Sequence, residues 1–160
     1  MSDLSGAAER LVGAPVLVLG DLMLDRFVYG EVERISPEAP IPVLKVVREA
    51  AMLGGAGNVV RNLSALGAAP LLVGAIGADE AGARIERLVA DAGVAARLVK
   101  LDGRPTTIKT RFVASAHQLL RADTEDARSL ADPELDALFT AAEATLKDVR
   151  VLVLSDYAKG

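Results

Sequence analysis

The stretch Val16-Leu-Val-Leu-Gly-Asp21 is the part of the sequence that decides the fold. Its four apolar residues follow one another without alternating polar positions, which is typical of a short strand buried on both faces, as in a parallel sheet. The run stops at Gly20 and Asp21. Because ligands in open α/β sheets usually bind just past the carboxyl ends of the strands, this stretch predicts a buried parallel strand with a polar site at its end.

Similar apolar runs recur at residues 70–76 and 150–154, and helical patterns lie between them. Apolar residues at helical spacing predict helices over residues 56–66, 81–92 and 133–146. The first two patterns end at Gly67 and Gly93, as helix C-caps do. For the third helix, Asp132 is expected as the N-cap and Pro133 as the first helical residue. This alternation of strand and helix favours βαβ units and an α/β fold.

Two segments interrupt the alternation, at about residues 26–49 and 104–123. The first contains two extended pieces joined by a turn with Pro37 and Pro40, and the second has two-residue alternation. Proline and strict alternation are typical of edge or half-exposed strands rather than of a buried parallel sheet. We therefore expect a small β-sheet lid beside the α/β body.

Composition limits the classes of function. The 160 residues are 51% hydrophobic and 25% charged, which is typical of one globular domain. A net charge of −4 and only 3% aromatic residues argue against nucleic acid as a partner. There is no cysteine, and no His/Glu set at metal-ligand spacing, so no metal site is predicted. The absence of a signal peptide or a membrane span favours a soluble cytoplasmic protein.

The glycine-rich run at residues 53–58 opens the first predicted helix. Gly54 and Gly55 would let a ligand oxygen approach the positive end of the helix, and Asn58 adds a donor and an acceptor. The alternative is a plain connection with Asn58 as a local cap. A dinucleotide-binding fingerprint is not supported, because Val60 occupies the position of its third glycine and no clear buried strand precedes the run.

Other polar residues that could bind a ligand follow the predicted strands. Asp21 and Asp25 are placed to accept hydrogen bonds from the hydroxyls of a sugar, although they could also be a turn residue and a solvated one. In the second lid segment, alternation puts Lys109 and Arg111 on one strand face. A solvated edge strand is equally compatible with this pattern. With Gln118 and Arg121 on the next strand, this face could instead close over an anionic substrate such as a sugar phosphate. His117, the only histidine, is given no role.

Taken together, these motifs closely resemble the ribokinase-like (PfkB) carbohydrate kinases, and within them the D-glycero-β-D-manno-heptose 7-phosphate kinases. The resemblance covers nearly the whole chain in matching order and spacing. It rests on Gly20-Asp21 through Asp25, residues 34–43, Gly54-Gly55-Ala-Gly-Asn58, Thr107-Ile-Lys-Thr-Arg111, Gln118-Leu-Leu-Arg121 and Ser155-Asp-Tyr-Ala-Lys-Gly160.

The resemblance implies a three-layer α/β/α body with a parallel sheet, present here in part, and a small β-sheet lid that often mediates homodimerisation. A pocket for the sugar would be lined by Asp21, Asp25, Gly54, Gly55 and Asn58, with Asp156 and Lys159 near its floor. The phosphate of the substrate would lie on the lid, near Lys109, Arg111, Gln118 and Arg121.

The resemblance also implies a division of labour along the kinase. Residues 1–160 correspond to the N-terminal, sugar-binding half, whereas the family places its catalytic base and its ATP and Mg²⁺ sites in a C-terminal half. The complete enzyme would phosphorylate heptose 7-phosphate at C1 for ADP-heptose and lipopolysaccharide core synthesis. The 160 residues alone are expected to be inactive and to bind no cofactor tightly. The alternatives are a kinase for another sugar or a nucleoside, and a non-catalytic module that binds sugar or dimerises.

Overall fold

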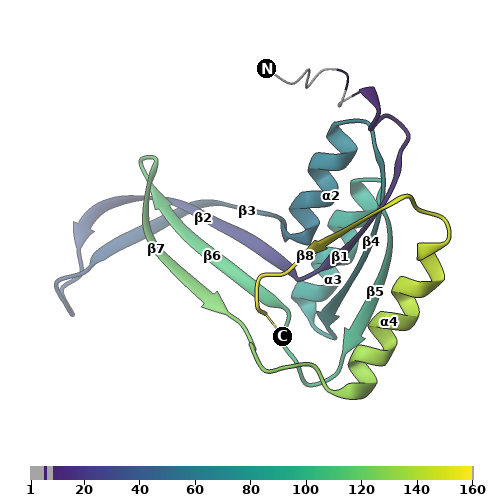
Figure 1. Ribbon diagram of the computed structural model, residues 1–160. Coiled ribbons are helices and arrows are strands. Elements are labelled where there is room, and N and C mark those ends of the chain that lie inside the picture. The colour runs from purple at the N-terminus through teal and green to yellow at the C-terminus, as the bar shows by residue number, and fades with distance from the viewer. Residues whose placement is uncertain (1–5, 7–8, 160) are drawn as a thin grey trace.

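The apolar run at residues 16–19 lies at the centre of a parallel four-stranded sheet, called the body sheet below. In the computed structural model, which describes residues 6 and 9–159, β1 (Pro15–Gly20) pairs with β4 (Ala69–Gly77) on one side and with β8 (Val151–Ser155) on the other (Figure 1). These three strands confirm the three predicted runs as strands, but β8 lies at the sheet edge and none of its side chains is buried, so the burial typical of such a run does not hold there. Gly160, the last residue of the motif at 155–160, lies outside the described residues.

The fourth strand of the body sheet, β5 (Ala95–Leu101), was not predicted from the sequence. It pairs with β4 at the sheet edge, in the order β5-β4-β1-β8. Arg97 and Lys100 interrupt its apolar residues, and most of its side chains are at least partly exposed. An edge strand does not need to be apolar throughout, so the continuous run that marks β1 is absent here.

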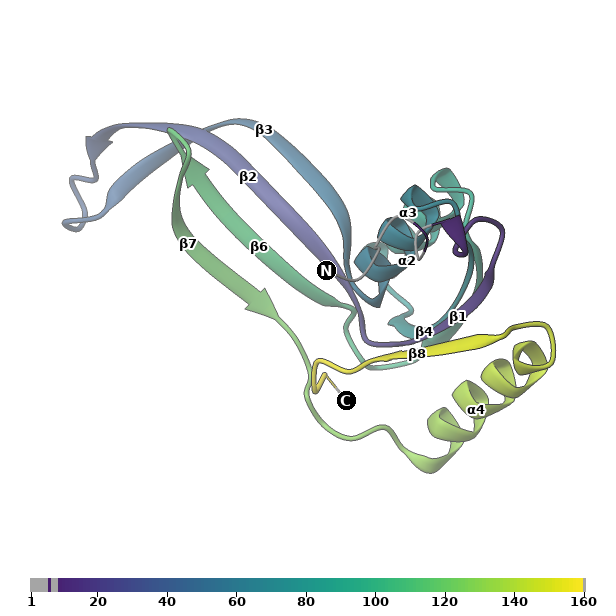
Figure 2. The ribbon, with the colours of Figure 1, turned by 45° about the horizontal axis from the view of Figure 1, so that its top comes forward.

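Helices cover both faces of the body sheet (Figure 2). α2 (Ala56–Ala65) and α3 (Glu80–Asp91) lie on one face and α4 (Asp132–Leu146) on the other, which confirms the three-layer α/β/α architecture. The predicted N-cap of α4 is wrong by one residue. Ala131 occupies that position, Asp132 is already helical, and the Glu134 carboxylate accepts a hydrogen bond from the Ala131 N–H at 2.8 Å. The Glu134 side chain therefore does the capping that was assigned to Asp132.

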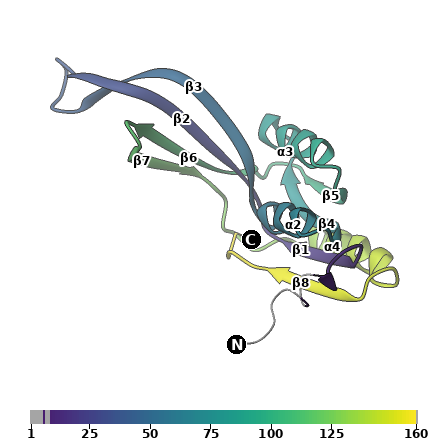
Figure 3. The same ribbon diagram turned by 90° about the horizontal axis from the view of Figure 1, so that it is seen from above.

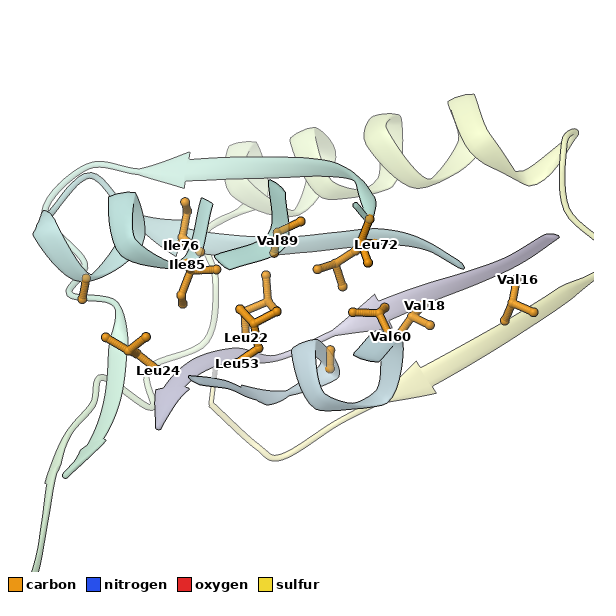
Figure 4. Packing of buried hydrophobic residues seen from close by; sticks show 13 residues of the cluster. Val16, Val18, Leu22, Leu24, Leu53, Val60, Leu72, Ile76, Ile85 and Val89 are labelled. Carbon is orange, nitrogen blue, oxygen red and sulfur yellow. The ribbon is translucent and has the colours of Figure 1, made fainter. Parts of the chain in front are cut away.

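The core has two parts because the side chains of β1 alternate between the faces of the sheet. Val16 and Val18 point towards α2 and α3 and belong to a cluster that includes Leu72 and Ile85 (Figure 4). Leu17 points the other way and packs with Val73 and Ala142 of α4, in the cluster on the opposite face. All three of these β1 side chains are at most 1% exposed, so β1 packs against helices on both faces of the sheet.

A second sheet, the lid sheet, projects from the carboxyl edge of the body sheet (Figure 3). Its strands are β2 (Leu22–Ile35), β3 (Pro42–Gly55), β6 (Thr107–Ala114) and β7 (His117–Thr124), in the order β3-β2-β6-β7. β2 and β6 are parallel, and the two outer pairs are antiparallel.

β2 and β3 reach further into the body than the lid segment predicted at 26–49, whereas β6 and β7 span residues 107–124, close to the segment predicted at 104–123. Asp21 alone separates β1 from β2, and β3 leads directly into α2. The last three residues of β3, Leu53–Gly55, are buried. These three residues belong to the glycine-rich run itself, whereas the preceding part of β3, residues 42–52, is exposed or half-buried, so no buried strand precedes the run, as expected. Two of these three residues are glycines, which give no apolar signal in the sequence.

Among the described residues, 6 and 9–159, no helix is both long enough and apolar enough to cross a membrane.

Candidate functional site

Asp21 lies where the body sheet meets the lid, and it hydrogen-bonds to backbone groups of three separate segments. Its Oδ2 accepts hydrogen bonds from the N–H groups of Tyr157 at 2.7 Å and Lys159 at 3.2 Å. Its own carbonyl oxygen accepts from the Ala56 N–H at 2.9 Å, at the first residue of α2. Asp21 thus ties together the end of β1, the start of α2 and the loop that follows β8.

Gly54 and Gly55 lie directly against the two predicted sugar-binding aspartates. A Cβ atom on Gly54 would lie 2.7 Å from Oδ2 of Asp25. A Cβ on Gly55 would lie 2.3 Å from the Asp21 carbonyl oxygen, and Gly55 has a φ of +56°, in the left-handed region. These two positions therefore require glycine. Asn58 is exposed in the first turn of α2, one turn beyond them.

One face of the lid sheet carries the predicted cations together with two carboxylates. Arg111 Nη1 donates a hydrogen bond to Asp25 Oδ1 at 2.6 Å. Lys109 Nζ lies 3.7 Å from Asp123 Oδ2, and Arg121 Nε donates to Asp123 Oδ1 at 3.0 Å. The strand register pairs Lys109 with Asp25 and Asp123, and Arg111 with Arg121, so these five side chains share one face.

This cluster confirms the predicted alternation of β6 and adds a partner that sequence reasoning missed. Asp123 was not singled out, although its position two residues after Arg121 on the same strand places it on the same face. Gln118 pairs with Val113 and lies at the far end of this face, beyond a register shift between Phe112 and Val113.

Asp156 and Lys159 lie in the loop after β8, apart from the lid cations. Asp156 Oδ1 accepts from the Ala158 N–H at 2.7 Å within a local turn, and Lys159 Nζ lies 2.9 Å from Glu125 Oε2. Together with Asp21, they line a cavity of about 330 Å³ at the carboxyl end of the body sheet. The predicted residues are thus brought together as two groups: a floor group of Asp21, Asp156 and Lys159, and a lid group around Asp25 and Arg111.

A buried network that the sequence analysis did not identify fixes the connection from β5 to the lid. The hydroxyl of Thr106, a residue only 2% exposed, accepts from the Gly77 N–H at 2.9 Å and donates to Asp79 Oδ1 at 2.7 Å. Asp79 also caps α3 by accepting from the Gly82 N–H, and its Oδ2 accepts from the Thr106 N–H. Burial tends to raise the pKa of Asp79, but the hydrogen bonds from Thr106 and Gly82 outweigh it, so the pKa is lowered.

Arg104 holds the second connection, from β7 to α4. Its guanidinium donates to the carbonyl oxygens of Asp126, Arg128 and Ser129, at distances from 2.5 to 3.1 Å. A longer contact of 3.5 Å reaches the carbonyl oxygen of Lys159. Arg104 therefore links the lid connection to the loop that carries Lys159. Within residues 6 and 9–159, no group of three or more His, Cys, Asp or Glu side chains is arranged to hold a metal ion.

Solved carbohydrate kinases have the same fold. A carbohydrate kinase from Agrobacterium tumefaciens superposes with a TM-score of 0.70 at 24% identity, over 88% of this chain and 45% of that one. Phosphofructokinase-2 from Escherichia coli, solved in complex with substrates and products, gives a TM-score of 0.66 at 23% identity, over 90% of this chain and 44% of that one. At these identities the likeness concerns the fold alone.

Curated relatives are much more similar in sequence. The chain is 56% identical to the bifunctional protein HldE of Paramagnetospirillum magneticum, over 100% of this chain and 34% of that protein. It is 52% identical to the D-beta-D-heptose 7-phosphate kinase of Bordetella bronchiseptica, over 96% of this chain and 48% of that protein. The chain thus spans between a third and a half of the length of these relatives.

The sequence pattern that defines one family of sugar kinases matches residues 14–159, which include both groups of predicted site residues. The body sheet, the lid and this match lead to the same assignment, and the chain belongs to the pfkB family of carbohydrate kinases.

Proposed function

We propose that this chain forms the sugar-binding part of a kinase that transfers the γ-phosphoryl group of ATP to the C1 hydroxyl of D-glycero-β-D-manno-heptose 7-phosphate. The observation that carries the proposal is the pairing of Asp25 with Arg111 on a lid face that also holds Lys109 and Arg121. A carboxylate suited to sugar hydroxyls and cations suited to a phosphate occur there side by side. The names of the curated relatives support heptose 7-phosphate as the substrate.

In this proposal the two groups of residues bind different parts of the substrate. Asp25 accepts hydrogen bonds from sugar hydroxyls, and Gly54 leaves the space that its carboxylate needs. Gly55 at the end of β3 and Asn58 in the first turn of α2 are placed beside the sugar in this proposal. Arg111, with Lys109, Arg121 and Gln118, binds the phosphate. Asp156 and Lys159 form the floor, and Asp21 holds their loop in place through the N–H groups of Tyr157 and Lys159.

Phosphoryl transfer depends mainly on holding the acceptor in line and on stabilising charge at the transferred group. We assign the first task, positioning of the acceptor, to the residues described here. ATP and Mg²⁺ supply the phosphoryl group and its charge neutralisation, and we propose that the catalytic base and the nucleotide site belong to residues beyond these 160. By themselves, residues 1–160 are then expected to bind the sugar phosphate without phosphorylating it.

The test is a kinase assay on the full-length protein with ATP and Mg²⁺. Heptose 7-phosphate, unphosphorylated heptose, ribose, fructose 6-phosphate and a nucleoside are compared as acceptors, and the products are identified by mass and by phosphorus NMR. Formation of heptose 1,7-bisphosphate with kcat/KM at least about a hundredfold above every other acceptor is expected. A higher kcat/KM for an unphosphorylated sugar or a nucleoside would show instead a kinase for that acceptor. If no acceptor is phosphorylated, the remaining alternative is a non-catalytic module that binds sugar.

We also propose that the protein forms a homodimer through the lid sheet. The strands at its two edges, β3 and β7, expose apolar side chains, with Val46 52%, Val47 63% and Leu120 58% exposed. Exposed apolar edge strands are typical contact surfaces. Sedimentation of the full-length protein should give the mass of a dimer, and Leu120→Lys should shift it towards the monomer. A monomeric wild-type protein at micromolar concentration would contradict the proposal.

A further inference from the structure

The ion pair between Asp25 and Arg111 occupies the polar atoms that a sugar phosphate would need. The two side chains are 20% and 23% exposed and are joined by a hydrogen bond of 2.6 Å. A charge-assisted bond between partly buried groups is costly to break unless each group finds another partner. A ligand that enters here must therefore replace both halves of the pair.

A neutral sugar can replace only one half. Its hydroxyls can donate to Asp25, but they leave the guanidinium of Arg111 without an anion. The other carboxylate of this five-residue cluster, Asp123, is already within 3.7 Å of Lys109 and 3.0 Å of Arg121. Three cations thus share two carboxylates, and a phosphate on the ligand would supply the missing negative charge.

Arg111 has a second contact that would hold it in place after Asp25 is released. Its guanidinium carbon lies 5.2 Å from the centroid of the Phe27 ring, which neighbours it on β2. Cation–π contact of this kind keeps a guanidinium in place without satisfying its charge. The cation therefore stays at the same point of the lid while its anion changes.

We infer that Asp25 and Arg111 form an exchangeable pair, so that binding of the sugar hydroxyls depends on the ligand carrying its own anion. Hydroxyls replace Arg111 at Asp25 while the phosphate replaces Asp25 at Arg111. This inference rests on the proposed function and extends it. An unphosphorylated sugar therefore loses affinity for two reasons. It lacks the contact between phosphate and Arg111, and it must also break the Asp25–Arg111 pair without giving Arg111 another anion.

The test compares Arg111→Met with wild type in the full-length protein, by calorimetry with heptose 7-phosphate and with unphosphorylated heptose. Methionine keeps a long stem against Phe27 but removes the charge. Binding of heptose 7-phosphate is expected to weaken by about tenfold or more, and binding of heptose to tighten by about threefold or more because Asp25 is freed. The matched control is Arg26→Met on the opposite face of β2, where Arg26 pairs with Glu49 at 2.6 Å; it should change neither affinity.

The outcomes separate the two proposals. If Arg111→Met weakens the binding of heptose 7-phosphate but does not tighten the binding of heptose, the exchange of partners between Asp25 and Arg111 is wrong. The assignment of Arg111 to the phosphate then stands. If heptose 7-phosphate binds to the variant as it does to wild type, the phosphate assignment itself is wrong. A second variant, Asp25→Asn, releases Arg111 from its carboxylate and should bind inorganic phosphate at least about threefold more tightly than wild type. Unchanged phosphate affinity in that variant would also overturn the exchange.

Discussion

Asp21 and Asp25 are four residues apart, and the structure gives them different partners. The sequence suggests a ligand role for both, because both follow a buried strand. In the structure the Asp21 carboxylate accepts from backbone groups 136 and 138 residues further along the chain, whereas the Asp25 carboxylate pairs with a lid cation. The residues next to an aspartate in the sequence predict that it lies at the site. Its partners far along the chain determine what its carboxylate does there.

The same limit applies to Asp79, which sequence reasoning passed over. As an Asp before a helical pattern it could have been identified as an N-cap. Its second partner, Thr106, is 27 residues away and is supplied by the connection between β5 and β6. We predict that Asp79→Ala lowers the free energy of unfolding by about 2 kcal/mol at pH 7, because it removes the cap and leaves the buried Thr106 N–H without its acceptor.

This loss should depend on pH in a defined direction. The folded protein lowers the pKa of Asp79 below its usual value of 3.8, so the charged carboxylate stabilises the fold above that value. The stabilisation is lost as the pH falls through the lowered pKa. Urea unfolding should thus show a difference between wild type and Asp79→Ala that is full at pH 7 and smaller at pH 3. Asp136→Ala, on the exposed side of α4, serves as the control, and a pH-independent difference for Asp79→Ala would refute the argument.

At the scale of elements, periodicity predicts what is regularly apolar and misses what is not. The helices and the three apolar strands β1, β4 and β8 follow from their apolar residues, and the outer parts of the lid follow from alternation. The inner ends of β2 and β3 and the whole of β5 were missed. In β3 and β5, Gly54, Gly55, Arg97 and Lys100 give no apolar signal. The inner end of β2, Leu22–Leu24, is apolar and buried, but only Asp21 separates it from β1, so periodicity does not mark it as a second strand.

The hairpin between β6 and β7 offers a prediction at this scale. Its turn residues Ser115 and Ala116 have φ angles of +46° and +68°, which side-chain-bearing residues rarely adopt. Replacing them by Asn-Gly should raise the free energy of unfolding by about 1 kcal/mol, because this pair suits a turn with two positive φ angles. Chemical denaturation measures the change. Ala122→Gly in the extended part of β7 is the control and should destabilise, and a double variant no more stable than wild type would show that the turn is not strained.

At the scale of the whole molecule, the α4 side of the body sheet is incompletely covered in the described residues. Leu154 of β8 is 68% exposed and Phe139 of α4 is 58% exposed, and both line the cavity at the carboxyl end of the sheet. The apolar stripe predicted for α4 is thus confirmed as a pattern, although only part of it is buried. Exposed apolar surface of this kind promotes association.

We therefore predict that residues 1–160, prepared alone, self-associate through this face. The double variant Leu154→Lys/Phe139→Lys should reduce the weight-average mass in sedimentation without lowering the melting temperature by more than a few degrees, because both side chains are largely exposed. Leu66→Lys at the end of α2, on the opposite side of the sheet, is the control and should leave the mass unchanged. A wild-type fragment that stays monomeric at about 100 μM would rule out this surface as an association site.

The single residue between β1 and β2 has a mechanical consequence. β2 is 14 residues long, so it extends roughly 40 Å beyond Asp21 if it is taken as a straight strand. A tilt of about 10° at this joint would carry the tip of the lid about 7 Å, while the residues beside Gly54 would move by less than an ångström or two. A slight change of angle at Asp21 would therefore become a large movement of the outer edge of the lid.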